Sequence, residues 1–408
     1  MSTEQTIGVL ARYNINWTAG ILYLNTIAQA LQHLPADNRP GIRLIQTTKE
    51  KAKSKNQLAA CFHSGALFYD RWNASLQGSV RQAMLNLIGK KPKHGSLEQV
   101  IAQHQITCVF PCQESLGRDF PVPWIGWIPD FQHKHYPDNF SEKERDKRDK
   151  RYQRLVDEAP LIVVSSHCAK EDIIRYYNAS PNRVRVYSFC TYPDPTWFEP
   201  NARDVADKLG LPEKYLMFPS RFWIHKNHLN LLKAIEKAKD QYSDIALVLT
   251  GRGEDFRHTK YAAELKAKLN SKSLRDHVFW LGLLPRIEQI QVMRCAAAIV
   301  QPSFFEGWSM LVEDARSLGK PIYISDIPVH REQNPGQATF FAPQDPADLH
   351  EVICNSWPSI TPGPNPTSEA EAKSEINRQL RKNAQTLTEI FDEALEIGSC
   401  VSKSLAIS

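Results

Sequence analysis

Short apolar runs alternate along this chain with longer segments in which apolar residues recur at helical spacing. The apolar runs predict twelve strands, at residues 7–11, 42–46, 106–110, 124–128, 161–165, 184–188, 216–219, 245–251, 278–281, 298–301, 321–325 and 339–341. Helical spacing separates most of them, for example at residues 20–31, 67–88, 169–178, 229–239, 261–268 and 286–294. This alternation favours parallel sheets covered by helices on both faces. Twelve strands are too many for one ordinary sheet, so we expect an α/β protein with two Rossmann-like domains.

A proline-rich segment marks the expected boundary between the two domains. Pro193, Pro195 and Pro200 lie close together and cannot continue a helix or a central strand. We therefore expect an N-terminal domain over residues 1–192 and a C-terminal domain over residues 200–365. Helical apolar spacing continues beyond them, so residues 366–408 are expected to form C-terminal helices.

The composition is that of an ordinary globular protein. The chain has 408 residues, of which 42% are hydrophobic, and a net charge of +5, which leaves room for two hydrophobic cores. It has no apolar run of about 18 residues and no N-terminal secretion signal, so a cytoplasmic location is expected. The eight cysteines are scattered without zinc-ligand spacing, which favours reduced thiols.

Two parts of the chain concentrate charge. Between Ser141 and Pro160, seven Lys or Arg residues accompany six Asp or Glu residues, which favours a solvated helix face over a nucleic-acid-binding patch. Other clusters are more one-sided, with lysines at positions 49, 51, 53, 55, 90, 91 and 93. These lysines could attract an anionic lipid or an acidic acceptor, so peripheral membrane contact is one expectation. The alternative is that they are exposed loop lysines that aid solubility.

The most informative stretch, residues 303–321, has the features of an anion-binding turn. It follows the apolar run at residues 298–301, and a turn at Gly307 opens a helix that ends near Gly319. Unpaired N–H groups and the helix dipole at such a helix start favour a bound anion. A carboxylate at the turn and another on the helix suit a ligand with a diphosphate, a sugar and a ribose. The candidate ligand-binding residues of this stretch are Glu306, Gly307, Trp308, Ser309, Glu313 and Asp314.

Two basic residues follow the expected strand at residues 216–219. Arg221 offers a planar fork of donors and Lys226 a compact charge. Together they can neutralise a leaving nucleoside diphosphate, which requires positive charge close by. Their spacing, and the turn at Glu306 further along the chain, favour a diphosphate-binding role.

These residues resemble the family 4 glycosyltransferases, which have the two-domain GT-B fold. In that family an Arg, four residues and a Lys clamp the donor diphosphate, as Arg221 and Lys226 would here. A Glu, seven residues and a second Glu mark the donor site, whereas this chain has Glu306 and then Asp314. Either Asp314 replaces the second Glu or the neighbouring Glu313 takes that role. Asp314 is preferred because the following glycine and proline then stay in register.

The resemblance implies further site residues. Gly20 would face the donor from the N-terminal domain, and Gly251 would belong to a nucleotide-facing loop. His133 would point into the cleft near the transferred sugar, with Asp130 orienting it. The structural alternatives are a helix start without a ligand for Gly20, a plain turn for Gly251 and a packed histidine for His133.

The resemblance also implies a function. It is that of a retaining glycosyltransferase that moves a sugar from a nucleoside diphosphate sugar to a hydroxyl of a carbohydrate, lipid or small-molecule acceptor. Glu306, His133 and Asp130 would be catalytic, and no metal or cofactor is expected, since the chain has no Asp-x-Asp motif. The alternatives are a sugar-nucleotide-binding protein without transfer activity and a GT-B epimerase or phosphorylase.

Overall fold

The computed structural model describes residues 5–11, 18–47, 62, 66–69, 96–199, 201–255 and 257–407. Its first sheet has seven parallel strands in the order β3-β2-β1-β4-β5-β6-β7. Non-consecutive neighbours such as β1 and β4 require crossover connections, which helices provide. The strands are β1 (Thr6–Ala11), β2 (Gly41–Thr47), β3 (Ala66–Tyr69), β4 (Cys108–Cys112), β5 (Trp124–Ile128), β6 (Leu161–Val164) and β7 (Val184–Val186).

The second sheet has six parallel strands in the order β10-β9-β8-β11-β12-β13. Its four central strands, β9, β8, β11 and β12, are mainly apolar and almost entirely buried, as expected for strands covered on both faces, whereas the edge strands β10 and β13 are partly exposed. The six strands are β8 (Leu216–Pro219), β9 (Leu247–Thr250), β10 (Val278–Trp280), β11 (Ala298–Gln301), β12 (Ile322–Ser325) and β13 (Ala338–Phe341).

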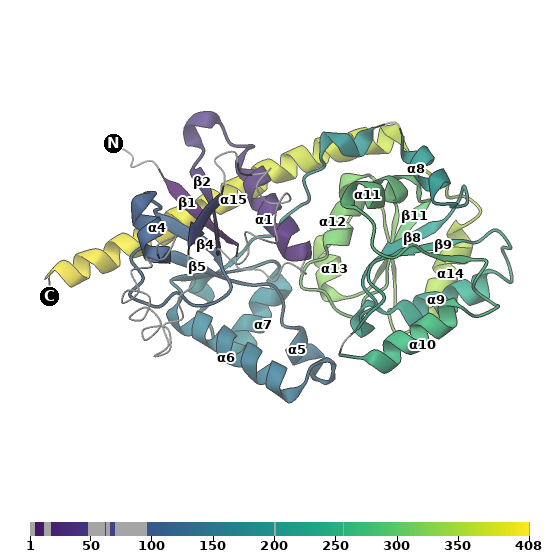
Figure 1. The fold of residues 1–408 in the computed structure, drawn as a ribbon, viewed down its shortest axis with the longest axis horizontal. Helices are drawn as coiled ribbons and strands as arrows, with labels where there is room; N and C mark the ends of the chain where they lie inside the picture. The colour runs from purple at the N-terminus through teal and green to yellow at the C-terminus, as the bar shows by residue number, and fades with distance from the viewer. Residues whose placement is uncertain are drawn as a thin grey trace, which may run out of the picture.

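Helices pack on both faces of each sheet (Figure 1). Those that follow strands of the first sheet are α1 (Thr18–Leu31), α4 (Leu97–Gln103), α5 (Gln132–His135), α6 (Glu142–Glu158) and α7 (His167–Tyr177). The second sheet is associated with α8 (Ala202–Lys208), α9 (His228–Ala238), α10 (Thr259–Leu269), α11 (Arg286–Cys295), α12 (Met310–Ser317), α13 (Pro328–Gln333) and α14 (Pro346–Ser356). Short 3-10 turns complete the described elements: η1 (Ala36–Asn38), η3 (Pro137–Asn139), η4 (Pro181–Arg183), η5 (Pro195–Phe198) and η6 (Ile224–Lys226).

The last helix, α15 (Pro366–Ile407), runs from the second domain back across the first (Figure 1). Its apolar stripe includes Ile376, Leu380, Leu387 and Phe391, at the spacing of one helix face, and these residues are fully buried in the core beside α1 and the first sheet. Near its start, Glu369 accepts hydrogen bonds from Nε and Nη2 of Arg294 on α11, at 2.8 and 2.9 Å. The helix therefore joins the two domains through an apolar stripe and a buried ion pair.

The predicted fold class is confirmed, since the described residues form two Rossmann-like domains that face each other across a cleft. Most predicted strands appear within one or two residues of their expected ends. The predicted helix at residues 67–88 is wrong at its start, because residues 66–69 form β3, which pairs with β2. A four-residue apolar run does not distinguish a buried strand from a helix turn by periodicity, and only the pairing with β2 decides it.

Three sequence expectations concern features away from the cleft. The lysines at positions 49, 51, 53, 55, 90, 91 and 93 lie outside the described residues, so membrane contact stays a prediction. No helix within the described part of the chain is long and apolar enough to cross a membrane. The seven described cysteines are free thiols.

Candidate functional site

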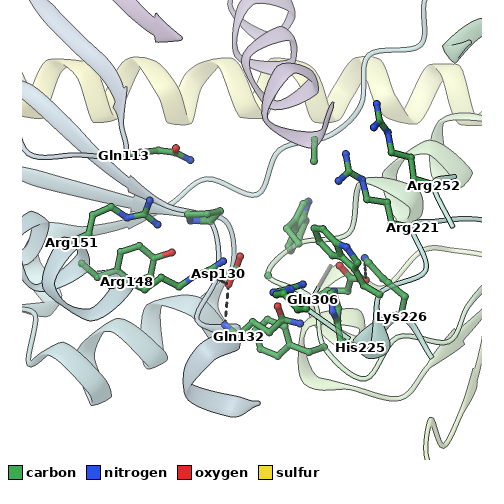
Figure 2. A pocket seen from close by; sticks show the side chains of 18 of the residues that line it. Gln113, Asp130, Gln132, Arg148, Arg151, Arg221, His225, Lys226, Arg252 and Glu306 are labelled. Atoms are coloured by element: carbon green, nitrogen blue, oxygen red, sulfur yellow. Dashed lines mark hydrogen bonds and ion pairs between the residues drawn. The ribbon is translucent and has the colours of Figure 1, made fainter. Parts of the chain in front are cut away.

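A cavity of about 620 Å³ lies between the two domains and is lined by both of them (Figure 2). Its lining mixes apolar surface with charged groups, and it has more basic than acidic side chains. The residues are Ala19, Gln113, Pro129, Asp130, Gln132, Arg148, Arg151, Tyr152, Arg221, Trp223, His225, Lys226, Arg252, Glu254, Arg257, Phe305, Glu306, Gly307 and Trp308. Many of them follow the carboxyl ends of parallel strands, where open α/β sheets bind ligands.

The C-terminal wall of the cavity carries the two predicted basic residues together. Arg221 follows β8, Lys226 ends η6, and Arg252 follows the neighbouring strand β9. Figure 2 shows Arg221, Arg252 and Lys226 on the same side of the cavity. Burial and the nearby Arg252 lower the pKa of Arg221. This crowding of positive charge favours a multiply charged anion on this wall.

Glu306 is held in place by two donors from its own domain. Lys226 Nζ lies 2.6 Å from Glu306 Oε1, and the Gln301 side-chain amide donates to the same oxygen at 2.8 Å. Gln301 also donates to Ser309 Oγ at 3.0 Å, and Ser309 caps α12 by accepting from the Val312 N–H at 3.4 Å. The carboxylate, the clamp lysine and the helix start therefore form one connected network.

The turn at Gly307 touches the opposite domain. A Cβ atom on Gly307 would lie 2.2 Å from the carbonyl oxygen of Pro129, so only glycine permits this approach. Beside it, the Trp308 indole N–H donates to the Phe189 carbonyl at 2.9 Å across the domain boundary. The structure therefore has the domains in contact along the edge of the cavity.

A second contact between the domains involves a helix N-terminus. Glu332 on α13 accepts hydrogen bonds from the backbone N–H groups of His167 and Cys168, at 2.7 and 3.2 Å. These N–H groups open α7 and have no partner within that helix. A carboxylate from one domain thus caps a helix of the other, which stabilises the contact between the domains.

Asp314 and Glu313 lie outside the cavity lining. Arg286 donates to both oxygens of Asp314 at 2.8 and 2.6 Å, and the Asp314 side chain is only 4% exposed. Glu313 is buried as well, and Gln333 Nε2 donates to it at 2.8 Å. Asp314 is thus occupied by a bidentate ion pair, and a ribose contact from either residue requires one of these interactions to open.

His133 differs most from its expected position. Its side chain is fully buried, with Nε2 at 3.0 Å from Asp149 Oδ1 and 2.9 Å from the Tyr177 hydroxyl. Burial lowers the pKa of His133, and the Asp149 contact opposes that change. Asp130 does line the cavity, but its carboxylate accepts from the Gln132 N–H at 3.0 Å and from Arg148 at 3.3 Å. The expectation that Asp130 orients a cleft-facing His133 is therefore corrected.

The two predicted glycines lie close to the cavity without lining it. Gly20 is buried in the first turn of α1, next to the lining residue Ala19. Gly251 has a φ of +115°, and a Cβ there would lie 2.4 Å from the Ser220 carbonyl. Gly251 thus lets the turn after β9 pack against the segment that carries Arg221, which is a positioning role.

Several lining residues were not predicted from the sequence, and they come from helices as well as loops. Arg257 is one of them, and its guanidinium lies 4.9 Å from the ring centroids of both Phe140 and Trp223. Because Phe140 and Trp223 belong to different domains, Arg257 bridges the cleft. Little in the sequence indicated this role for Arg257, since a single arginine in a chain with many charges has no characteristic spacing from other site residues. The unpredicted lining residues include Gln113, Gln132, Arg148, Arg151, Trp223, His225, Arg252 and Arg257.

The buried Glu313 carboxyl predicts a pH dependence of stability. Burial raises its pKa from 4.5 to about 7, although Arg316 and Gln333 oppose that change. The folded state therefore binds more protons than the unfolded state between these values, so stability falls as pH rises from about 4.5 through 7. Glu313→Gln should remove this loss, which is on the order of 3 kcal/mol. Denaturant midpoints measured between pH 5 and 8 check it.

Glu371 provides the control for that experiment, because it is exposed on α15. Glu371→Gln should keep the pH dependence of the unmodified protein. Parallel pH profiles for Glu313→Gln and the unmodified protein would contradict the role assigned to Glu313.

The fold and cavity define a class of protein: two Rossmann-like domains with a basic, ligand-sized cleft at the carboxyl ends of their strands. Residues 203–355 match the family model described as glycosyl transferases group 1. The O-antigen chain mannosyltransferase RfbU of Salmonella typhimurium is 25% identical over 233 residues, which cover 56% of this chain and 59% of that protein. The D-inositol 3-phosphate glycosyltransferase of Corynebacterium glutamicum is 25% identical over 207 residues, 47% of each chain.

Solved structures extend the likeness to the whole chain at the level of the fold. The crystal structure of Anabaena Alr3699/HepE in complex with UDP and glucose has a TM-score of 0.61 and 15% identity, covering 99% of this chain and 100% of that one. By contrast, this chain spans about half the length of the curated relatives it matches, 59% and 47% for the two named above. The family-model match thus supports a glycosyltransferase domain over residues 203–355, and the solved structures support the two-domain fold.

Proposed function

We propose that this protein is a retaining, metal-independent glycosyltransferase that transfers a sugar from a nucleoside diphosphate sugar to an acceptor hydroxyl. One observation carries the proposal: Arg221, Lys226 and the turn at Gly307 line a single cavity between the domains. These residues belong to separate parts of the chain, and their convergence is what binding of a pyrophosphate requires. The match of residues 203–355 to glycosyl transferases group 1 supports the same function.

In the proposed reaction, the clamp stabilises the charge that develops on the leaving group. The bond between the sugar's anomeric carbon and the phosphate oxygen breaks, and its electron pair goes to that oxygen. Arg221 and Lys226 face this oxygen and supply positive charge there. The acceptor oxygen forms the new bond on the same face, and its proton passes to the leaving phosphate oxygen, which retains the anomeric configuration.

Glu306 has the role of binding the sugar in this proposal. Its carboxylate lines the cavity and is oriented by Lys226 and Gln301. A carboxylate so fixed can accept hydrogen bonds from sugar hydroxyls without reorganising. Lys226 then contacts both the Glu306 carboxylate and the diphosphate. The scissile bond would therefore lie between the sugar held by Glu306 and the phosphate held by Lys226.

One observation favours a second candidate, a sugar-nucleotide-binding protein without transfer activity. Asp314 stands where the resembled family has a second Glu, and Arg286 occupies both of its oxygens. If this ion pair persists with a ligand bound, Asp314 makes no ribose contact. Binding of a sugar nucleotide without product, over a broad acceptor panel, would favour this candidate. Sugar release that depends on phosphate would favour a phosphorylase.

A thermal-shift screen with nucleoside diphosphates and their sugars tests the proposal. A ligand at about 100 times its Kd should add roughly 2.7 kcal/mol of stability and raise the melting temperature. A transfer assay with the donor that gives the largest shift then identifies the acceptor. Melting temperatures unchanged by every nucleoside diphosphate would overturn the proposed function.

A further inference from the structure

We infer that the acceptor carries a phosphate group, held by Arg148 and Arg151 of α6 together with the side-chain amide of Gln132. The inference rests on the proposed function, because it assigns the part of the cavity that the donor leaves free. Six of the residues that line the cavity are Lys or Arg, and three are Asp or Glu. That excess of positive charge is divided between two walls that belong to different domains.

The C-terminal wall supplies the basic residues that would bind the donor diphosphate. Arg221, Lys226 and Arg252 all come from the second domain, and Lys226 is balanced by Glu306. Figure 2 places these residues across the cavity from Arg148 and Arg151. A nucleoside diphosphate bound to the C-terminal wall therefore leaves the basic side chains of α6 facing the remaining space.

The basic side chains of α6 form a distinct group on the N-terminal wall. Arg148 and Arg151 are three residues apart, which puts them on one face of the helix. Arg148 is paired with Asp130 at 3.3 Å. Among the residues that the structure describes, no carboxylate pairs with Arg151, whose guanidinium instead lies 5.0 Å from the ring centroid of Tyr152.

Two buried donors on this wall lack partners within the described part of the chain. Arg151 Nε and Gln132 Nε2 are both buried and make no hydrogen bond there, and the Gln132 residue is only 6% exposed. Leaving a buried donor unsatisfied costs about 1–3 kcal/mol, more for a charged group, so such donors are seldom left without a function. Both belong to residues that line the cavity, which indicates that a ligand accepts from them.

Arg154, on the exposed part of α6, provides a comparison with a solvated arginine on the same helix. Arg154 is 66% exposed and pairs with Glu158 one turn later, at 3.0 Å. Arg151 has neither property. Its position on the cavity side of α6 is therefore not explained by the charged character of the helix alone.

A phosphate matches these donors better than a neutral or a carboxylate group. Guanidinium groups bind phosphate through paired N–H donors, and a phosphate ester offers three terminal oxygens. Two guanidiniums and one amide can each bond a different oxygen, whereas a carboxylate has only two. The acceptor class is thus a hydroxyl compound with a phosphate ester near the reacting hydroxyl, either a soluble phosphate or a phosphorylated lipid headgroup.

Matched acceptor pairs test the inference in the intact protein with its donor. Sugars and polyols are compared with their phosphate monoesters, and vesicles of phosphatidylinositol with vesicles of phosphatidylinositol phosphate, which adds a monoester to the same hydroxylated headgroup. Phosphorylated acceptors should have kcat/KM values about 100-fold higher, as expected for two charge-assisted hydrogen bonds. Preference for the soluble esters or for the vesicles then identifies the source of the phosphate. Equal rates with neutral and phosphorylated acceptors would overturn the inference.

Arg151→Gln separates this subsite from the donor site. It should lower kcat/KM for the phosphorylated acceptor about 10- to 100-fold and leave the nucleotide-induced melting shift unchanged. Arg154→Gln, on the same helix, should change neither. Wild-type kcat/KM in Arg151→Gln would refute the subsite, whereas absence of any nucleotide-induced shift in the unmodified protein would refute the proposed function instead.

Inorganic phosphate gives a readout that does not depend on transfer. With a nucleoside diphosphate saturating the donor wall, added phosphate should raise the melting temperature of the unmodified protein. The rise should be smaller in Arg151→Gln and normal in Arg154→Gln. An equal rise in all three proteins would place the phosphate elsewhere and contradict the inference.

Discussion

Glu306→Gln is expected to lower kcat for sugar transfer by about 10²- to 10³-fold, the loss seen when one fixed electrostatic contact is removed from an active site. The substitution keeps the shape of the side chain, but it removes the charge that pairs with Lys226 at 2.6 Å. The neutral amide also accepts more weakly from sugar hydroxyls and no longer balances the clamp lysine. Steady-state kinetics with a saturating donor measure the effect.

Two control measurements show whether a lower kcat reflects the role of Glu306 in transfer. Glu351→Gln changes the same charge on the exposed face of α14 and should leave kcat unchanged. The melting temperature of Glu306→Gln without ligand should stay close to that of the unmodified protein, because Gln301 can still hydrogen-bond the new side chain. A kcat within a few-fold of the unmodified value in Glu306→Gln would remove this residue from the mechanism.

The double substitution Arg221→Ala, Lys226→Ala should nearly abolish binding of nucleoside diphosphates. Hydrogen bonds to charged groups contribute about 1.5–3 kcal/mol each, so losing two of them predicts a Kd about 10²- to 10⁴-fold higher. Both residues line the same wall of the cavity, so their effects on one diphosphate should be coupled. Calorimetric titration with the nucleoside diphosphate identified by the thermal-shift screen measures Kd.

A matched pair of surface residues controls for the loss of two positive charges. Lys272 and Arg275 are exposed in the segment between α10 and β10 of the same domain. Lys272→Ala, Arg275→Ala should bind the nucleotide as the unmodified protein does. Unchanged nucleotide affinity in the Arg221→Ala, Lys226→Ala variant would refute the diphosphate-binding role of these two residues.

The order of elements was predictable because the buried strands and the helices have different patterns of apolar residues. Parallel strands buried on both faces appear as short continuous apolar runs, and β5, β8 and β11 begin and end where those runs do. The C-terminal site was predictable for a related reason. Arg221 and Glu306 each follow one of these strands closely, and the carboxyl ends of parallel strands meet at one edge of a sheet.

The N-terminal side of the cavity was not predictable in the same way. Gln132 and His133 are neighbours on the short helix α5, and successive residues of a helix point in directions about 100° apart. Gln132 faces the cavity, while His133 turns inward to Asp149 and Tyr177. The motif located the right loop, but the rotation of one helical turn decided which side chain lines the site.

The amino-acid pattern alone predicted two parallel sheets, all of their strands except β3, and the positions of Arg221, Lys226 and Glu306 after the strands. These features depend on local periodicity and on short spacings, which a linear pattern contains. Three features could be seen only in the folded protein: the ion pair of Arg286 with Asp314, the approach of Gly307 to Pro129, and the place of Arg151 in the cavity lining. Each of these depends on how separate elements dock and rotate against one another, and packing over the whole chain sets that geometry.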